Sequence, residues 1–201
     1  MIPAVAITGL ILAGGRGTRM GHVDKGLQAF RGLPLAAHAI ARLAPQVGTL
    51  AININRNHAQ YAPFGLPLWP DTLPDFAGPL AGLQAGLSRC TTPYLLSVPC
   101  DSPLLPLDLA ARLSAALEST DADLALAVTS GDDGQIQRHP VFCLMKTTVL
   151  PQLNDYLRDG GRKMENWMTT LAMIDVHFDD HAAFDNLNTL QQLQQLEQRP
   201  L

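Results

Sequence analysis

Short apolar runs alternate along the chain with stretches whose apolar residues recur every three or four positions. The run at 6–12 is almost entirely apolar, which is typical of a strand covered on both faces of its sheet. A helical stripe follows at 34–43, where Pro34 suits the first turn. Further strands are predicted at 49–53, 66–69, 94–98, 123–129 and 141–145, with helices after Pro79 and along Leu109, Leu113 and Leu117.

This order of elements predicts an α/β fold: a mostly parallel sheet with right-handed crossovers and helices on both faces, in three layers. The second half is less regular. Segment 150–171 carries mixed helical signals interrupted by a pair of glycines, and a short helix is predicted at 190–196. Thr189 and Gln192 have the spacing of a capping box at the start of that helix.

Composition narrows the class of protein. The 201 residues suit one domain, and 47% hydrophobic residues supply a core. A net charge of −4 argues against a nucleic-acid partner. No apolar run reaches the roughly 18 residues of a membrane helix, so we expect no membrane partner. The three cysteines share no CxxC spacing, which favours neither a disulfide framework nor a zinc site, and we expect a cytoplasmic protein.

A glycine-rich segment at 12–21 directly follows the first predicted strand. Glycines there let backbone N–H groups approach a phosphate chain. The segment lacks the GKS or GKT of a Walker A loop and the GxGxxG spacing of a dinucleotide site. A tight turn that binds nothing is the plain alternative. Arg16, Arg19 and Lys25 favour a phosphate site, because clustered cations beside exposed amides are stabilised by an anion.

The segment reads LAGGRGTRMGHVDK from Leu12 to Lys25. It resembles the N-terminal signature of the molybdenum cofactor guanylyltransferases, the MobA family. Later elements of that family follow in order over nearly the whole chain: Asn53-x-Asn55-Arg56, Asp71, GPLAG at 78–82, PCD at 99–101, His139-Pro140 and NLNT at 186–189.

Two related families differ at this signature. Sugar-nucleotide pyrophosphorylases usually carry a proline where this chain has Asp24, and molybdopterin cytidylyltransferases typically show LAAG where this chain has LAGG. Both differences favour guanine as the base. An enzyme of the same fold acting on CTP or on a sugar phosphate remains an alternative, as does a non-catalytic GTP-binding regulator that releases no diphosphate.

The resemblance implies a Rossmann-like nucleotidyltransferase fold and the transfer of GMP from GTP to molybdenum-molybdopterin, with release of diphosphate. It divides the single domain 1–201 into a GTP-binding half up to about residue 105 and a molybdopterin-binding half after it. The residues implied to bind substrates are Leu12, Ala13, Gly14, Gly15, Lys25, Asn53, Asp71, Gly78, Gly82, Asp101, Arg162, Asn186 and Asn188. The implied catalytic residues are Arg19, Lys25 and Asp101, with Asp101 as the ligand of Mg²⁺.

Asp101 also has a physical case. It follows a predicted buried strand, so its carboxylate lies at the edge where open α/β sheets bind ligands. Mg²⁺ takes a few carboxylates with phosphate oxygens and water, so one aspartate beside a triphosphate begins such a site. A helix N-cap is the alternative. Asn53 and Asp71 lie at the carboxyl ends of successive predicted strands, and their alternatives are a turn residue and an N-cap.

The implied chemistry needs little acid–base catalysis, because the attacking phosphate oxygen is already ionised. Positioning and charge neutralisation by Lys25, Arg19 and Mg²⁺ are expected to dominate. We expect Asp24 to restrain Lys25 before substrate binds. Cys100 is expected to be a buried packing thiol rather than a nucleophile.

His139 is expected to be structural or to face the substrate. We expect a monomer whose partners are the two substrates and other proteins of molybdenum cofactor biosynthesis and delivery.

Overall fold

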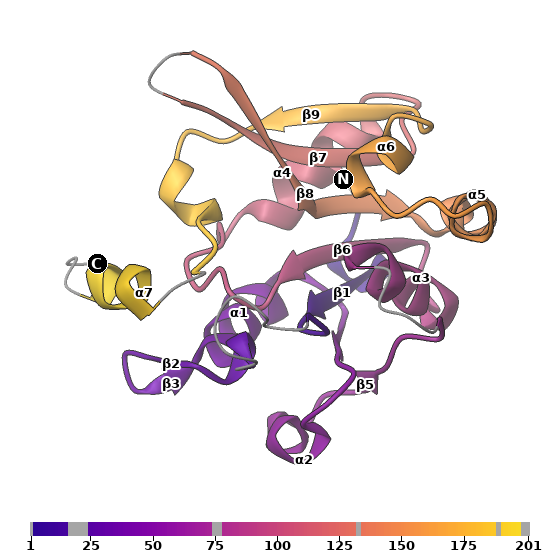
Figure 1. The fold of residues 1–201 in the computed structure, drawn as a ribbon. Helices are drawn as coiled ribbons and strands as arrows, with labels where there is room; N and C mark the ends of the chain where they lie inside the picture. The colour runs from indigo at the N-terminus through magenta and orange to yellow at the C-terminus, as the bar shows by residue number, and fades with distance from the viewer. Residues whose placement is uncertain (1, 16–23, 74–77, 132–133, 188–189, 198–201) are drawn as a thin grey trace.

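The computed structural model describes residues 2–15, 24–73, 78–131, 134–187 and 190–197. Within these residues a seven-stranded sheet has the order β5-β4-β1-β6-β8-β7-β9 (Figure 1). Its strands are β1 Ile7–Leu12, β4 Thr49–Asn53, β5 Leu68–Trp69, β6 Tyr94–Pro99, β7 Leu124–Ser130, β8 Ile136–Lys146 and β9 Met173–His177. β8 is antiparallel to both neighbours and the other pairings are parallel, so the predicted mostly parallel sheet is confirmed.

Helices cover both faces of this sheet (Figure 1). They are α1 Leu35–Leu43, α2 His58–Tyr61, α3 Pro79–Arg89, α4 Leu109–Glu118, α5 Leu150–Arg158, α6 Met164–Met168 and α7 Leu190–Glu197. Short 3-10 turns lie at Ala4–Ala6, Lys25–Leu27, Ala44–Gln46, Ala62–Phe64, Thr147–Val149 and His181–Phe184. None of the described helices is long and apolar enough to cross a bilayer.

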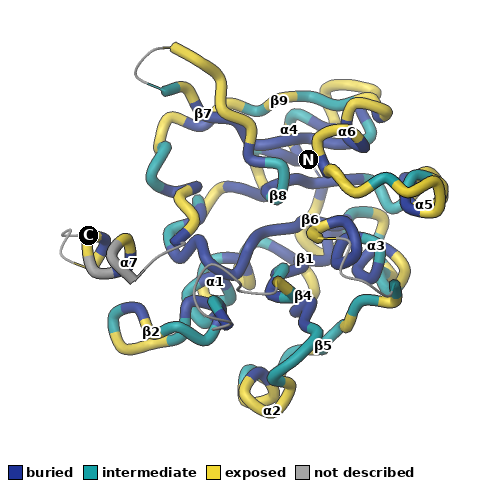
Figure 2. The backbone as a smooth tube through the Cα atoms, in the orientation of Figure 1, coloured by how far each residue is buried: buried dark blue, intermediate teal, exposed yellow. Residues whose placement is uncertain are grey.

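Two apolar cores lie on opposite faces of the sheet, because successive strand side chains point to opposite sides. Ile7 and Ile11 of β1 join the core that contains the buried leucines of α4 and, from α1, Ala36, Ala39 and Leu43. Leu10 joins the core that contains buried residues of α3, α5 and α6. Gly86 lets α3 lie close to β1, since a Cβ there would collide with Leu10. The strands form the buried centre of the molecule in Figure 2.

The irregular second half departs most from the expectations. Segment 150–171 forms α5 and α6, separated at Gly160, whose φ is +85°. β8 begins at Ile136 rather than at 141, because its first residues pair with β7 beyond a register shift. β9 was not predicted. It is a half-exposed edge strand, so its sequence lacks the apolar run of a buried strand.

The chain returns to the first half through α7. Leu187, Leu193 and Leu196 pack on Phe30 and Leu35 in a small third core beside the hairpin of β2 (Ala29–Phe30) and β3 (Leu33–Pro34). The predicted C-terminal helix is thus confirmed, whereas Thr189 of the capping box lies outside the described residues. This docking carries segment 186–187 back to the carboxyl end of β6.

Candidate active site

A cavity of about 460 Å³ opens at the carboxyl ends of β1, β4 and β6. From β1 the chain proceeds to β4 on one side of the sheet and later to β6 on the other. Such a switch point is where open α/β sheets bind ligands. The cavity is lined by Leu12, Gly14, Gly15, Asn53, Asp71, Gly78, Pro79, Pro99, Asp101, Val141 and Asn186.

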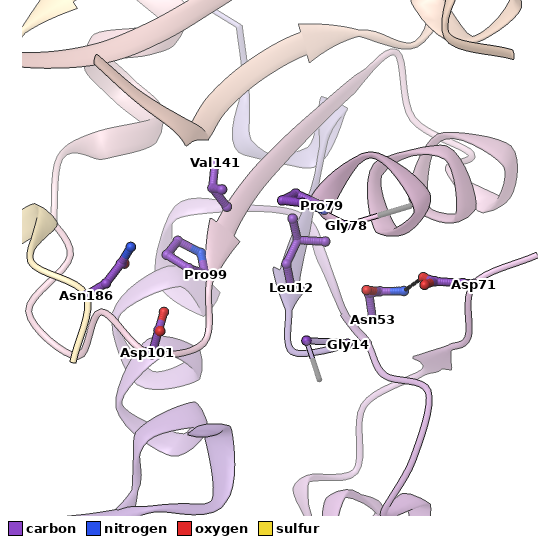
Figure 3. Close-up of a pocket in the computed structure, with 11 residues that line it drawn as sticks. Leu12, Gly14, Asn53, Asp71, Gly78, Pro79, Pro99, Asp101, Val141 and Asn186 are labelled. Atoms are coloured by element: carbon purple, nitrogen blue, oxygen red, sulfur yellow. Dashed lines mark hydrogen bonds between the residues drawn. The ribbon is translucent and has the colours of Figure 1, made fainter. Parts of the chain in front are cut away.

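Asn53 and Asp71 lie on one side of this cavity and Asp101 lies on the other (Figure 3). We call Asn53 and Asp71, with Asn55 bonded to Asp71, the amide end, and Asp101, with Lys25 bonded to it, the lysine end. Leu12 and Gly14 lie between them.

At the amide end, asparagine side chains hold both oxygens of Asp71. Asn53 Nδ2 donates to Asp71 Oδ1 at 2.8 Å, and Asn55 Nδ2 donates to Asp71 Oδ2 at 2.8 Å. The Asp71 backbone N–H donates to Asn55 Oδ1 at 2.9 Å. A carboxylate fixed by neutral donors keeps its charge and its remaining lone pairs, so Asp71 is oriented as a hydrogen-bond acceptor.

Glycines make room for this network. A Cβ on Gly14 would lie 2.8 Å from Asn55 Nδ2, and one on Gly82 would lie 2.5 Å from Asn53 Oδ1. Gly82 therefore supports Asn53 from α3 without lining the cavity. Gly78 has a φ of +63° and precedes Pro79, so the N-terminus of α3 begins at the cavity wall. Helix N-termini favour anions.

Part of the backbone of the glycine-rich segment is already engaged. The Leu12 carbonyl accepts from Cys100 N at 3.1 Å, and Ala13 N donates to Asn53 O at 2.9 Å. Ala13 is buried and does not line the cavity. Arg56 donates to the Gly15 carbonyl at 3.1 Å, which ties the segment to the end of β4.

At the lysine end, Lys25 Nζ donates to Asp101 Oδ2 at 2.9 Å. Asp101 is 7% exposed, and its backbone carbonyl accepts from Leu187 N at 2.9 Å. Ser102 Oγ donates to Asn186 Oδ1 at 2.7 Å, so the returning C-terminal segment lies against the loop after β6. Figure 3 shows Asn186 and Asp101 on the same side of the cavity.

Several sequence expectations fall elsewhere. Arg19 and Asn188 lie outside the described residues. Arg162 is exposed, does not line the cavity, and donates to the carbonyls of Leu157 and Gly161 at the end of α5. The Lys25 ammonium pairs with Asp101, and the Asp24 carboxylate accepts from Gly26 N, Asn57 and Tyr61, so Asp24 acts on the backbone of the Lys25 turn.

Val141 is a cavity residue that sequence reasoning missed. The register of β7 with β8 shifts between Leu126 and Val128, and the extra β8 residues include Val141. Its carbonyl accepts from Ser97 Oγ at 2.6 Å. The His139-Pro140 pair was the available signal, because proline inside a strand marks an edge or a bulge. Pro79 and Pro99 were part of the quoted motifs but were not assigned to the site.

Cys100 and His139 carry reactive side chains but have structural roles. Cys100 is buried, and burial, with Asp101 and Asp24 nearby, raises the pKa of its thiol well above the usual value. His139 bonds to Thr129 Oγ1 at 2.9 Å and stacks on Phe184. Burial, with a further contribution from His181, lowers the pKa of His139 to about 4. Cys100 is thus a packing thiol, and His139 is neutral at pH 7.

Sequence comparisons match nearly the whole chain to known proteins. A family model described as the MobA-like NTP transferase domain matches residues 9–173. The molybdenum cofactor guanylyltransferase of Bordetella petrii is 57% identical over 98% of this chain and 100% of that protein. The protein of the same name from Cupriavidus necator is 56% identical over 99% of this chain and 100% of that protein.

Solved structures show the same fold. The molybdopterin-guanine dinucleotide biosynthesis protein A of Archaeoglobus fulgidus has a TM-score of 0.74 at 19% identity, covering 94% of this chain and 96% of that one. The 4-diphosphocytidyl-2C-methyl-D-erythritol synthase of Anaerococcus prevotii has a TM-score of 0.72 at 10% identity, covering 96% and 97%.

Proposed function

We propose a function on the premise that the chain belongs to the family of MobA-like NTP transferases. It is a nucleotidyltransferase that transfers GMP from GTP to the phosphate of molybdenum-molybdopterin, giving molybdopterin guanine dinucleotide and diphosphate. Identities of 53–57% to curated molybdenum cofactor guanylyltransferases over nearly the whole chain carry this proposal.

The amide end supports guanine as the base. Guanine presents adjacent N–H donors on its ring and exocyclic nitrogens, whereas cytosine presents a ring-nitrogen acceptor beside its amino group. Asp71, oriented as an acceptor by Asn53 and Asn55, matches two adjacent donors. Cytosine would leave a buried acceptor facing another acceptor, which is costly.

The triphosphate then lies along Gly14 and Gly15 toward the lysine end. The N-terminus of α3 and the Lys25 ammonium supply positive potential there. Because the attacking phosphate oxygen is already ionised, Lys25 acts by holding two anionic groups together and neutralising charge.

Asp101 fits Mg²⁺ as a carboxylate ligand. Within the described ranges, no group of three or more His, Cys, Asp or Glu side chains gathers where a metal ion would bind. A lone aspartate beside a phosphate-binding cavity suits Mg²⁺, which keeps phosphate oxygens and water as most of its ligands. When bound, the ion neutralises charge on the transferred phosphoryl group. With GTP in the cavity, Lys25 would donate to the phosphates in place of Asp101.

Asn186, held against the loop after β6, is our candidate contact for the molybdopterin phosphate, with Asn188 close to it in sequence. The cavity is thus lined by both the GTP-binding half and the molybdopterin-binding half. We place the enzyme in the cytoplasm as a monomer that works with molybdenum cofactor biosynthesis and delivery proteins.

The decisive experiment measures diphosphate release with GTP, CTP or a sugar phosphate plus nucleotide, each with and without molybdopterin. We expect release only with GTP, molybdopterin and Mg²⁺ together. Equal turnover with CTP overturns the guanine assignment. GTP binding without any diphosphate release would make the protein a non-catalytic GTP binder.

A further inference from the structure

A buried hydrogen-bond cluster centres on Asp24, the residue that precedes Lys25. Asp24 is 8% exposed, and its Oδ1 accepts from the Tyr61 hydroxyl at 2.7 Å and from Gly26 N at 3.2 Å. Its Oδ2 accepts from Asn57 Nδ2 at 2.9 Å. A buried carboxylate is tolerated only when donors satisfy it, and these three donors do so.

This cluster fixes the backbone on both sides of Lys25. The residue before it supplies the buried carboxylate, and the residue after it donates its N–H to that carboxylate. The turn Lys25–Leu27 is closed by Leu27 N to Asp24 O at 3.2 Å and Gln28 N to Lys25 O at 3.0 Å. The Cα of Lys25 is therefore held while its side chain extends to Asp101.

The Tyr61 hydroxyl has a role beyond packing. Tyr61 is fully buried in the core, and its ring meets Phe64 edge-on with centroids 5.8 Å apart. A phenylalanine ring would pack equally well there, so packing does not explain the hydroxyl. Gly26 shows how closely that hydroxyl approaches the turn, because a Cβ on Gly26 would collide with it. Burial raises the pKa of Tyr61, so its hydroxyl stays protonated and donates.

We infer that Asp24 and Tyr61 are positioning residues that aim Lys25 at Asp101 in the free protein and at the phosphates during the reaction. The second part of this inference rests on the proposed function of Lys25, and the first does not. Neither residue touches substrate. Their effect is on where the ammonium group lies, since an ångström of displacement weakens a positioned charge considerably.

The first part is tested on the free protein by ¹³C-dimethylation of lysines and NMR. The chain has three lysines, Lys25, Lys146 and Lys163, so the spectrum is simple and Lys25→Arg assigns the Lys25 signal. We expect Tyr61→Phe to move this signal toward that of the exposed Lys163, and Tyr94→Phe to leave it in place. Tyr94 begins β6 at the opposite end of the sheet from the cavity. An unchanged Lys25 signal in folded Tyr61→Phe overturns the inference.

The second part is tested by a double-mutant cycle in diphosphate release. Losing a buried hydrogen bond to a charged group predicts that Tyr61→Phe lowers kcat/KM for GTP roughly ten-fold. In a Lys25→Ala background the same change is expected to cost less than about two-fold, because its target is gone. If Tyr61→Phe lowers kcat/KM equally in both backgrounds, the change disturbs the structure generally, and the positioning role is overturned. Asp24→Asn serves as a second variant and must show the same dependence on Lys25.

Failure of the proposed function can be distinguished from failure of the positioning inference. If the wild-type protein turns over no GTP with molybdopterin, the proposed function fails, and the NMR result still decides whether Asp24 and Tyr61 place Lys25.

Discussion

The cavity contains two buried or half-buried aspartates that are held in different ways. Asp71 at the amide end accepts from two neutral amides, whereas Asp101 at the lysine end is paired with an ammonium group. Neutral donors orient a carboxylate without cancelling its charge, which suits recognition of a neutral base. A cationic partner cancels the charge and can be exchanged for another cation, which suits a place where phosphates and a metal arrive and leave. Substitutions at the lysine end should therefore lower mainly kcat, whereas substitutions at the amide end should change mainly the KM for GTP and the preference for its base.

The largest effect is expected at Asp101. Asp101→Ala removes the proposed metal ligand and the partner of Lys25, and loss of such a ligand predicts a fall in kcat of at least about 10²-fold. The fold should persist, because the Leu187 contact uses the Asp101 backbone carbonyl rather than its side chain. Turnover against Mg²⁺ concentration and a thermal melt check both statements. A normal rate with normal Mg²⁺ dependence refutes the metal role.

Lys25 tests the lysine end while leaving the proposed metal ligand, Asp101, in the chain. Lys25→Ala removes a charge that matters most in the transition state, so kcat/KM for GTP should fall by roughly 10²-fold, chiefly through kcat. Lys25→Arg should restore only part of the activity, because a planar guanidinium does not replace a compact ammonium. Steady-state kinetics of both variants give the answer. Near-normal kinetics in the alanine variant would mean that Lys25 only forms an ordinary surface ion pair.

The two ends also differ in how far sequence predicts them. Asn53 ends β4, and Asp101 comes shortly after β6. Both strands were predicted almost to the residue, because buried parallel strands are continuous apolar runs. Their meeting at one edge follows from the parallel topology. Tyr61 was not found, because its bond to Asp24 joins residues 37 positions apart and no local pattern marks it.

The second half of the chain was predicted less well from the sequence for a similar reason. Val141 reaches the cavity through a register shift, which depends on how β7 and β8 pair rather than on the apolar pattern of either strand. Strand β9 is half-exposed and contains Asp175, so its sequence lacks the continuous apolar run of a buried strand. Asn186 reaches the cavity through contacts distant in sequence, because Ser102 donates to its side chain and α7 packs on Phe30 and Leu35.

Asn55 tests the amide end. Asn55→Ala removes the donor to Asp71 Oδ2 and the acceptor for Asp71 N, so Asn53 alone of the two asparagines still holds the carboxylate. The loss of two hydrogen bonds predicts a KM for GTP raised roughly ten-fold and a reduced preference for GTP over CTP, with kcat nearly unchanged. Competition kinetics with both nucleotides measure this. If kcat falls and KM does not, the division between the two ends is wrong.

The smallest effect is expected at Arg162, which the family resemblance implies as a binding residue and which lies outside the cavity. Its guanidinium donates to the carbonyls of Leu157 and Gly161, as cations commonly do at helix C-termini. Arg162→Ala should therefore change the KM for GTP and for molybdopterin by less than about two-fold and lower the melting temperature by only a few degrees, as expected for an exposed cap. The neighbouring Arg158→Ala is the matched control, because it removes an exposed cation that pairs with Asp155 on the same helix. A ten-fold rise in the KM for molybdopterin in Arg162→Ala but not in Arg158→Ala would give Arg162 a role in substrate binding that this arrangement of the cavity does not show.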